Sequence, residues 1–546
     1  MAMAGLVVAG CLGMAGGAAS GSPEAVPPEP VHGGRLVRVL STGPDSLDPA
    51  KAVASETDRI LANLYDGLLG ADEQGRLVPR LAERYEVSAD GLTYTFFLRR
   101  GVRFHNGRER TSDDVRFTFE RLLDRATRYK RAADWQAVQA VQTPDPYTVV
   151  VRLSRPYAPF LAALADPSAS IVPREAVETL ATRPVGTGPF RFVEWVQESH
   201  VRLRRFDGYW DAPRPYLDEV IFRFIPDPAA ALAAFLAGDA DVVDISPDRV
   251  ALLQAPGARP SRVVSGPANV VQILALNQAR SPWDQLPVRR AVAHAIDRRE
   301  LISVISEGRA KPLYSGLTPE NAYFVPLDDP YPHDPAEARR LLSEAGYPDG
   351  VRATLVVPSV YEFHVQTAQL IQQQLARVGI RLEIQLVDWA RWLAEVYAGE
   401  QYDATIIGFT GKLDPHPELS RYHSSYARNF VNFADPDYDR VIDEAVRTAD
   451  PQRRRELYAE AQRILADRLA AIFLVDPTLT LAVAADVHGW AIYPHYIDDL
   501  RTVYRASGRC ASPEPLALRR PAGGRGRPVG PGGGVRGLPG DARPAR

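Results

Sequence analysis

The stretch ATLVV, residues 353–357, begins a strand–helix–strand pattern that decides the fold. Residues 380–387 (IRLEIQLV) alternate apolar and polar side chains, and residues 402–408 (YDATIIG) contain an apolar run, so both are expected to be strands. An amphipathic helix over 364–378 and a second helix over 389–398 separate the three strands. Strands joined by helices in this order predict a parallel α/β sheet with right-handed crossovers.

The segment GFTGKLDP, residues 408–415, follows the last of these strands. Ligands of open α/β sheets bind beyond the carboxyl ends of the strands, so Lys412 stands where a ligand is expected. A nucleotide-binding loop would have a glycine in place of Ile406 and a serine or threonine in place of Leu413. The lysine therefore does not belong to a loop of that kind and needs another explanation.

Shorter patterns predict further elements. Residues 92–98 alternate as a strand does, and Thr111 followed by Asp114 is typical of a capping box at the start of a helix. Asp334 before a proline starts another helix, which Gly346 ends.

The composition is that of a globular protein. The chain has 546 residues, of which 45% are hydrophobic and 24% are charged, and its length suits about two to four domains. A net charge of -3 gives no reason to expect nucleic acid as a partner. No apolar run reaches the roughly 18 to 20 residues that span a bilayer. No GxSxG or HExxH motif occurs, and His416 and His423 are too far apart on a probable loop to suggest a metal site, so neither a cofactor nor a metal is expected.

The two ends of the chain differ from its middle. Cys11 closes the sequence VVAGC, which is similar to a bacterial lipoprotein processing site, with the thiol as the lipid acceptor. The alternative is an ordinary cleaved signal that ends near Ala18 and Ala19. Either route places the mature protein outside the cytoplasm, in the periplasm or at the cell surface. Residues 506–546 are rich in Arg, Gly and Pro and are expected to be disordered.

An ordered series of motifs resembles one family along almost all of the foldable chain. They are STGPDSLDPA (41–50), a long block over 64–122, VGTGPFRFVEW (185–195), LAGDADVVD (236–244) and LALNQARSPWDQLPVRRAVAHAID (274–297). The chain is similar to the family 5 extracytoplasmic solute-binding proteins of ABC transporters, the oligopeptide/dipeptide/nickel-binding type.

The resemblance implies an α/β, two-lobed fold of the periplasmic-binding-protein type II (cluster C), with a hinge between the lobes and an extra subdomain in the first lobe. The chain would cross between lobes near 265–277 and return near 473–483. The expected division is a signal or lipoprotein segment and tether (1–33), lobe I (34–270, with the extra subdomain at about 61–185), lobe II (271–476), a return to lobe I (477–505) and a disordered tail (506–546).

The same resemblance implies function. The chain would be a monomer that captures a small polar solute between its lobes and delivers the solute to an ABC permease in the cytoplasmic membrane. A lipid anchor alone would attach the protein to that membrane. It would do no chemistry on the solute. The alternatives from other classes are a secreted hydrolase with a carboxylate-based site and a ligand-sensing module without import.

The resemblance also singles out Lys412. Dipeptide-binding members place an aspartate at this position, where it binds the peptide's ammonium group. They also place an arginine for the peptide's carboxylate at the strand end that corresponds to residues 358–361, and this chain has no arginine there. Ordinary dipeptides are therefore poor candidates, and a peptide-like, opine, saccharide or other anionic ligand is expected. Asp414 is an alternative partner for the lysine. The candidate ligand-binding residues are Lys412, Phe409, Thr410, Gly411, Asp414, Trp389, Tyr361, Asn277, Trp135 and Ser46, followed by Arg421 and Asn429.

Overall fold

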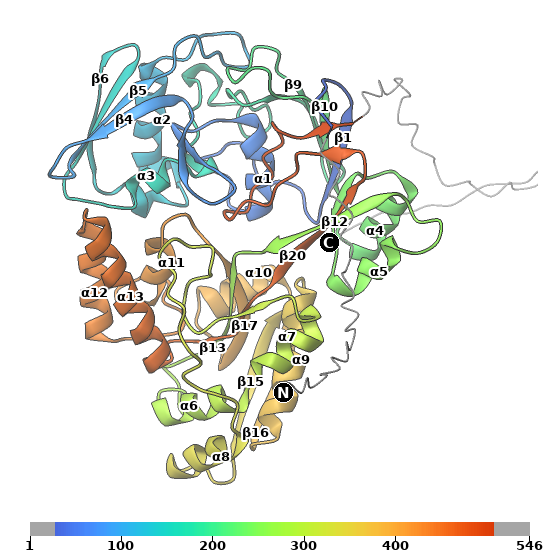
Figure 1. Cartoon of the computed structure of the whole chain (residues 1–546). Helices are drawn as coiled ribbons and strands as arrows, with labels where there is room; N and C mark the ends of the chain where they lie inside the picture. Colours follow the sequence, from blue (N-terminus) through green and yellow to red (C-terminus); the bar gives the residue numbers. More distant parts are fainter. Residues whose placement is uncertain (1–27, 507–546) are drawn as a thin grey trace, which may run out of the picture. The chain divides into compact units, whose positions relative to one another are not determined.

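The computed structural model describes residues 28–506, and its largest sheet has seven strands (Figure 1). Their order is β12-β20-β11-β1-β10-β9-β8. The strands are β1 (Arg35–Leu40), β8 (Phe190–Val196), β9 (His200–Arg205), β10 (Glu219–Phe224), β11 (Val242–Asp244), β12 (Ser261–Pro267) and β20 (Thr478–Ala484). Strand β20, the last strand of this sheet in the sequence, lies between β11 and β12, which are more than 200 residues earlier in the chain.

A second sheet of five strands contains the segments that decide the fold, in the order β16-β15-β17-β13-β18. The strands are β13 (Val270–Leu276), β15 (Val351–Pro358), β16 (Ile380–Val387), β17 (Ala404–Thr410) and β18 (Ile472–Phe473). Strand β15 runs parallel to both β16 and β17, so the predicted parallel arrangement is confirmed. Strand β13 pairs antiparallel to β17, so the sheet is mixed rather than fully parallel.

The helices between these strands also follow the predictions, with one difference. Helix α9 (Glu362–Ala376) packs on β15 and β16. The helix expected over 389–398 is a short α-helical turn, α10 (Trp389–Arg391), continued as a π-helix, η6 (Trp392–Tyr397). The wider π-helical turn brings Trp392 into the core, where it is 1% exposed and donates a hydrogen bond to Thr405.

A third sheet of four strands, in the order β4-β5-β7-β6, packs with helix α2 (Ser112–Leu123). The strands are β4 (Ala82–Val87), β5 (Thr93–Leu98), β6 (Val138–Asp145) and β7 (Thr148–Leu153). The predicted capping box of Thr111 and Asp114 is present at the start of α2, where it satisfies backbone N–H groups that have no partner within the helix.

The chain passes between the first two sheets twice. It leaves β12 at Pro267 and enters β13 at Val270, and it returns between Phe473, at the end of β18, and Thr478, at the start of β20. The two passages touch, because the Val270 N–H donates to a carboxylate oxygen of Asp476 at 3.0 Å.

The remaining elements complete the described part of the chain. Two pairs of short strands are β2 (Leu69–Ala71) with β3 (Leu77–Pro79) and β21 (Val487–His488) with β22 (Tyr504–Arg505), and a third is β14 (Lys311–Pro312) with β19 (Val475–Asp476). The other α-helices are α1 (Ser55–Leu64), α3 (Phe160–Ala163), α4 (Pro228–Ala237), α5 (Val250–Leu253), α6 (Leu286–Ala295), α7 (Arg298–Ser306), α8 (Pro335–Glu344), α11 (His416–Leu419), α12 (Pro436–Arg447) and α13 (Pro451–Arg468). The shorter 3-10 helices are η1 (Arg125–Thr127), η2 (Ala132–Trp135), η3 (Pro167–Ala169), η4 (Arg174–Ala176), η5 (Pro247–Arg249) and η7 (Ser420–Tyr422).

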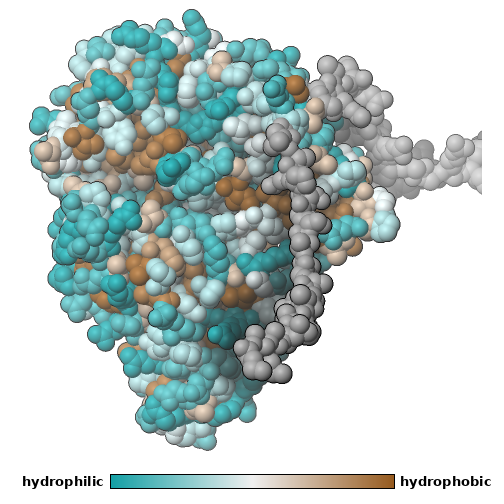
Figure 2. All heavy atoms as spheres, viewed as in Figure 1, coloured by the Kyte–Doolittle hydropathy of each residue, from teal (hydrophilic) through white to brown (hydrophobic). Residues whose placement is uncertain are grey.

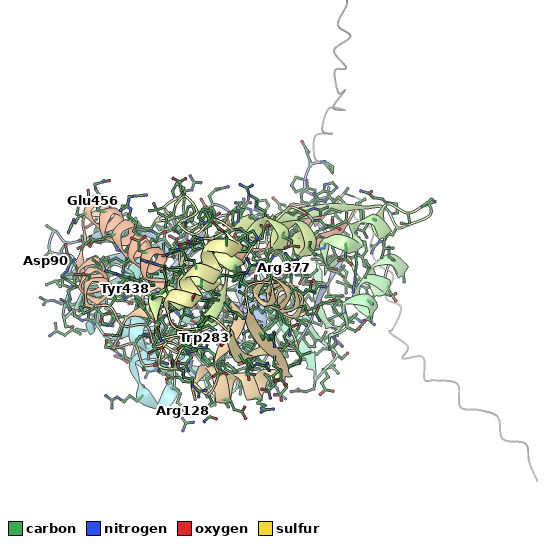
Figure 3. The ribbon with its side chains drawn as sticks, turned by 90° about the horizontal axis from the view of Figure 1, so that it is seen from below. Asp90, Arg128, Trp283, Arg377, Tyr438 and Glu456 are labelled. Atoms are coloured by element: carbon green, nitrogen blue, oxygen red, sulfur yellow. The ribbon has the colours of Figure 1, made fainter. Side chains whose placement is uncertain are left out.

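Helix α8 begins after Asp334, whose carboxylate accepts from the N–H groups of Ala336 and Glu337, as its sequence predicts. Figure 3 shows Trp283 and Tyr438 among the helices around the second sheet, and both side chains are buried. Hydrophilic residues cover most of the face shown in Figure 2, with hydrophobic residues in small patches. Within residues 28–506 no helix is both long and apolar enough to cross a membrane.

A pair of carboxyl groups lies at the passage between the sheets. Asp476 is 1% exposed, and Glu320, whose side chain is 15% exposed, receives a hydrogen bond of 2.7 Å from Lys311. One oxygen of each carboxyl group is buried without a partner among the described residues. Burial, together with the neighbouring Glu320, raises the pKa of Asp476 to about 8.

Asp476→Asn is expected to change how stability depends on pH. A carboxyl group whose pKa is higher in the folded chain than in the unfolded chain favours folding at low pH, and this contribution is lost as the pH rises from about 4 to about 8. Between pH 5 and pH 8.5 we expect the free energy of unfolding of the variant to rise by about 2–4 kcal/mol relative to that of the wild type, measured by denaturant unfolding. Asp207→Asn, at an exposed carboxylate, is the control and should show no such difference. An equal offset for Asp476→Asn at both pH values would contradict the account.

Candidate functional site

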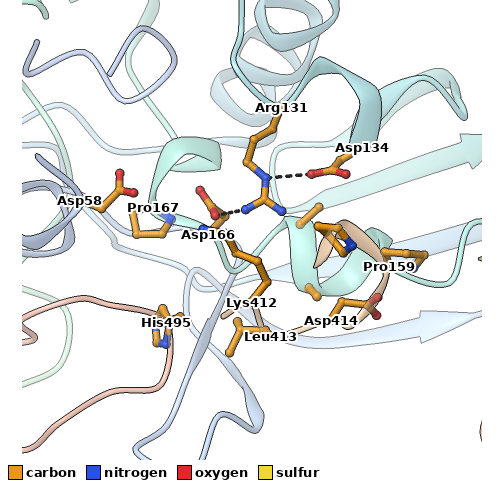
Figure 4. A pocket seen from close by; sticks show the side chains of 13 residues that line it. Asp58, Arg131, Asp134, Pro159, Asp166, Pro167, Lys412, Leu413, Asp414 and His495 are labelled. Atoms are coloured by element: carbon orange, nitrogen blue, oxygen red, sulfur yellow. Dashed lines mark hydrogen bonds and ion pairs between the residues drawn. The ribbon is translucent and has the colours of Figure 1, made fainter. Parts of the chain in front are cut away.

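Lys412 lies in a pocket lined by charged residues from distant parts of the chain (Figure 4). Asp58 comes from α1, while Arg131 and Asp166 directly precede η2 and η3. Lys412 follows β17, and His495 follows the last strand of the first sheet. The pocket therefore collects side chains beyond the carboxyl end of β17, where a ligand was expected.

The acidic residues of the pocket have cationic partners on the same side. Arg131 pairs with Asp134 at 2.8 Å and with Asp166, and Lys130 lies 3.5 Å from Asp58. Burial would raise the pKa of Asp166, but Arg131, Lys412 and Lys130 outweigh it and hold that pKa below its usual range. Burial raises the pKa of Asp58 to about 6, because the charge of Lys130 offsets the effect of burial only in part.

Lys412 itself has no carboxylate within 4.0 Å of its ammonium group in the part of the chain that the structure describes. Burial lowers its pKa, and the nearby Arg131 lowers it further, while Asp166 and Asp58 act in the opposite direction. The charge of the lysine is thus surrounded by groups that already have partners. Asp414, the expected alternative partner, instead forms an ion pair of 2.8 Å with Arg454.

The backbone around Lys412 is held firmly. Its N–H donates to the carboxylate of Glu418, which is 2% exposed, and its carbonyl oxygen accepts a hydrogen bond of 3.1 Å from Asn321. Burial raises the pKa of Glu418 to about 7. The side chain of Lys412 is therefore presented from a fixed loop rather than from a mobile one.

Gly411 fixes the same loop against the passage between the sheets. Its N–H donates to the Asn269 carbonyl oxygen at 2.6 Å, and a Cβ at this position would overlap the Asn269 side-chain amide. Asn269 lies between β12 and β13 and has a φ of 53°, a conformation that asparagine tolerates better than most residues. The loop that carries the lysine and the passage between the sheets are thus in direct contact.

Two aromatic residues predicted for the site, Tyr361 and Trp389, form an exposed pair. Tyr361 and Trp389 are 41% and 37% exposed, and their rings lie 5.5 Å apart, with Trp389 stacked on Trp392. Phe409 is partly buried near the end of β17, beside Thr410. None of these residues lines the pocket around Lys412, so a role in ligand binding stays a prediction for them.

Four other candidates have structural roles instead. Trp135 is fully buried and packs edge-on against Phe119 and Phe160, so in this structure its ring is not open to a ligand, contrary to its place among the candidate ligand-binding residues. Asn277 is 1% exposed, and its amide donates to backbone carbonyl groups of Glu400 and Tyr402.

Asn429 is 8% exposed and donates to the carbonyl groups of His423 and Phe433, which leaves its amide nitrogen no role toward a ligand. Ser46 lies in a buried turn, where its hydroxyl oxygen accepts from the Asp48 N–H, and it does not line the pocket.

Sequence reasoning missed the residues that face Lys412. Asp58, Arg131, Asp166 and His495 carry no motif, and only the fold brings them together. Burial lowers the pKa of His495 to about 4, and its Nδ1 is buried without a partner within residues 28–506. No group of three or more His, Cys, Asp or Glu side chains in that range could hold a metal ion.

Comparison with known sequences gives strong likenesses. A model of the bacterial extracellular solute-binding proteins, family 5 Middle, matches residues 76–432. The chain is 32% identical over 465 residues to the glutathione-binding protein GsiB of Salmonella choleraesuis (strain SC-B67), covering 82% of this chain and 90% of that protein. GsiB of Escherichia coli O157:H7 is 30% identical over 464 residues, with the same coverage.

Solved structures are similar over nearly the same length. The ABC transporter-associated periplasmic binding protein DppA of Helicobacter pylori, in complex with the peptide STSA, is 28% identical with a TM-score of 0.77, covering 87% of this chain and 99% of that one. AgaA of A. tumefaciens R10, in complex with agropinic acid, is 27% identical with a TM-score of 0.74, covering 86% and 99%. These superpositions confirm the predicted periplasmic-binding-protein fold.

Gly411→Ala tests the contact between the loop and the passage. The added methyl group must displace the Asn269 amide, and overpacking of this kind costs about 1–3 kcal/mol in the free energy of unfolding. Denaturant unfolding measures the loss. The control is Gly43→Ala, where the Cβ would lie 3.1 Å from the Phe224 ring, compared with 2.2 Å from the Asn269 amide oxygen at Gly411. Equal stability of Gly411→Ala and wild type would show that the contact is not constraining.

Proposed function

The chain belongs to the bacterial extracellular solute-binding proteins of family 5, and on that premise we propose that it binds a small, amino-acid-derived anion. It is the substrate-binding component of an ABC import system, with a permease as its membrane partner, and it works outside the cytoplasm. The proposal concerns which solute it captures and which residues hold that solute.

One observation carries the proposal. Lys412 points a cation into a pocket whose carboxylates already face Arg131 and Lys130, and no carboxylate among the described residues lies within 4.0 Å of it. A charge that is shut away from water without a partner costs several kcal/mol, so a closed site around Lys412 favours a ligand that brings its own negative group. A carboxylate is the negative group that amino-acid-derived solutes carry.

The relatives support this class of ligand. GsiB is named for glutathione, a peptide with more carboxylate than ammonium groups, and AgaA was solved with agropinic acid, an organic acid. Free glutathione and agropinic acid are therefore the first compounds to test. The other peptide-like, opine, saccharide and anionic solutes follow.

We also propose how the capture works. Lobe I (34–270, with the subdomain at about 61–185, and the return over 477–505) and lobe II (271–476) would close about the two passages between the sheets. Closure on a ligand requires that the closed state binds it more tightly than the open state does. Lys412 contributes to that difference, since its charge is compensated by the ligand only when the pocket is shut.

The protein would release the solute unaltered. Its relatives are solute-binding proteins rather than enzymes, and we propose that the chain does no catalysis. A hydrolase would instead convert more ligand than there is protein, which mass analysis of the supernatant after incubation detects.

A lipid anchor at Cys11 and a monomeric state are further proposals. Cys11 and the Arg/Gly/Pro-rich tail lie outside the described residues, so the VVAGC sequence alone supports the anchor. Labelling of cells with an alkyne fatty acid should mark the wild type and not Cys11→Ala. A labelled Cys11→Ala protein would exclude the anchor.

Lys412→Met and Lys412→Glu test the ligand contact. A hydrogen bond to a charged group contributes about 1.5–3 kcal/mol, so Lys412→Met is expected to weaken binding of the anion about 10- to 100-fold, and Lys412→Glu by more. Isothermal titration of wild type and variants with the acid found to bind gives the measurement. Lys51→Met, at an exposed lysine, is the matched control. Equal affinity of all four proteins would remove Lys412 from the site.

A further inference from the structure

Arg421 offers a second cation near Lys412, in a fixed orientation. Its guanidinium carbon lies 3.9 Å from the centre of the Phe409 ring, and its Nε donates to the Glu418 carbonyl oxygen at 2.9 Å. The cation–π contact with the ring and the hydrogen bond together restrain the guanidinium group. An arginine held in this way loses less side-chain entropy when it binds an anion.

The guanidinium group has no anionic partner of its own. Within residues 28–506 no carboxylate lies within 4.0 Å of it, whereas nearby Arg454 pairs with Asp414 at 2.8 Å. The carboxylate of Glu418 accepts the Lys412 N–H instead, and among the described residues no oxygen of it lies within 4.0 Å of the guanidinium nitrogens. The side chain of Arg421 is partly exposed, so its remaining N–H groups are available to a solute.

Arg421 also lies beside the pocket. Phe409, on which it stacks, precedes Lys412 by three residues at the end of β17, and Pro417 of α11 lines the pocket just before Arg421 in η7. The same Glu418 whose carbonyl oxygen binds Arg421 also accepts the Lys412 N–H through its carboxylate, and this links the arginine to the loop that carries the lysine.

We propose that Arg421 is a second carboxylate anchor, so that the solute is an amino-acid-derived dicarboxylate held by Lys412 at one carboxylate and by Arg421 at the other. This inference rests on the proposed function and narrows its substrate class. The planar guanidinium fork suits a carboxylate because two parallel N–H···O bonds can form. Lys412 acts as a point charge inside the pocket, and Arg421 acts at its rim.

The test combines variants of the protein with changes in the ligand. Glutathione has two carboxylates, and its two mono-amides each lack one of them. Wild type, Arg421→Gln and Arg421→Lys are titrated with all three compounds. Arg428→Gln is the matched control, because Arg428 is exposed and lies 5.9 Å from the ring of Tyr397 without a carboxylate within 4.0 Å among the described residues.

The expected result is a coupling between residue and carboxylate. Arg421→Gln should weaken the binding of glutathione about 10- to 100-fold. It should leave the affinity for one mono-amide almost unchanged, because that compound has already lost the carboxylate that Arg421 binds. The affinity of Arg421→Lys for glutathione should lie between those of the wild type and Arg421→Gln, because lysine keeps the positive charge but lacks the two parallel N–H groups of the guanidinium fork. Arg428→Gln should bind all three compounds as wild type does. Thermal unfolding confirms that each variant is folded.

Two results overturn the inference while leaving the proposed function intact. In one, Arg421→Gln binds glutathione as wild type does. In the other, it weakens glutathione and both mono-amides by the same factor, as a merely structural role would. If wild type binds none of the three but binds an acid with one carboxylate, such as agropinic acid, the inference fails and the proposed function stands. A wild type that binds no amino-acid-derived acid at all removes the proposed function and the inference with it.

Discussion

The contact between Gly411 and Asn269 fixes the position of the loop that carries Lys412. Asn269 lies where the chain passes from the seven-stranded to the five-stranded sheet, and its carbonyl oxygen accepts the Gly411 N–H at 2.6 Å. Only a residue without a side chain fits there. The next residue is Lys412, so the position of the cation is tied to the passage about which the two sheets would move. A ligand that pulls on the lysine therefore also acts on the passage.

The charges around the pocket are the basis of the proposed preference for an anion. Its acidic residues, Asp58 and Asp166, are compensated by Lys130 and Arg131 on their own side, so they do not neutralise Lys412 fully. Asp414 is engaged by Arg454. The wall formed after β17 thus keeps a positive charge toward the solute. On the proposed function, this charge favours an anion over a peptide ammonium group.

Much of this fold could be predicted from the sequence. The alternation in 380–387 and the apolar run before Gly408 identify parallel strands, and the capping residues Thr111 and Asp334 mark helix starts, because these signals are local. The place of Lys412 followed from the rule that ligands bind beyond the carboxyl ends of strands. Its neighbours Asp58, Arg131 and His495 could not be predicted, since they are brought together only by packing of segments hundreds of residues apart. The burial of Trp135 could not be predicted for the same reason, because the sequence around a tryptophan does not show whether its side chain faces the solute or the core.

The central claim is that this protein encloses an intact, negatively charged solute whose charge Lys412 compensates. Native mass spectrometry of the protein purified from its own cells tests it most directly, with the bound compound then released and identified. The account predicts one small carboxylate-bearing molecule per chain, unaltered on release, and its loss from Lys412→Glu. A bound cation or neutral sugar, or an acid retained equally by Lys412→Glu, would contradict it.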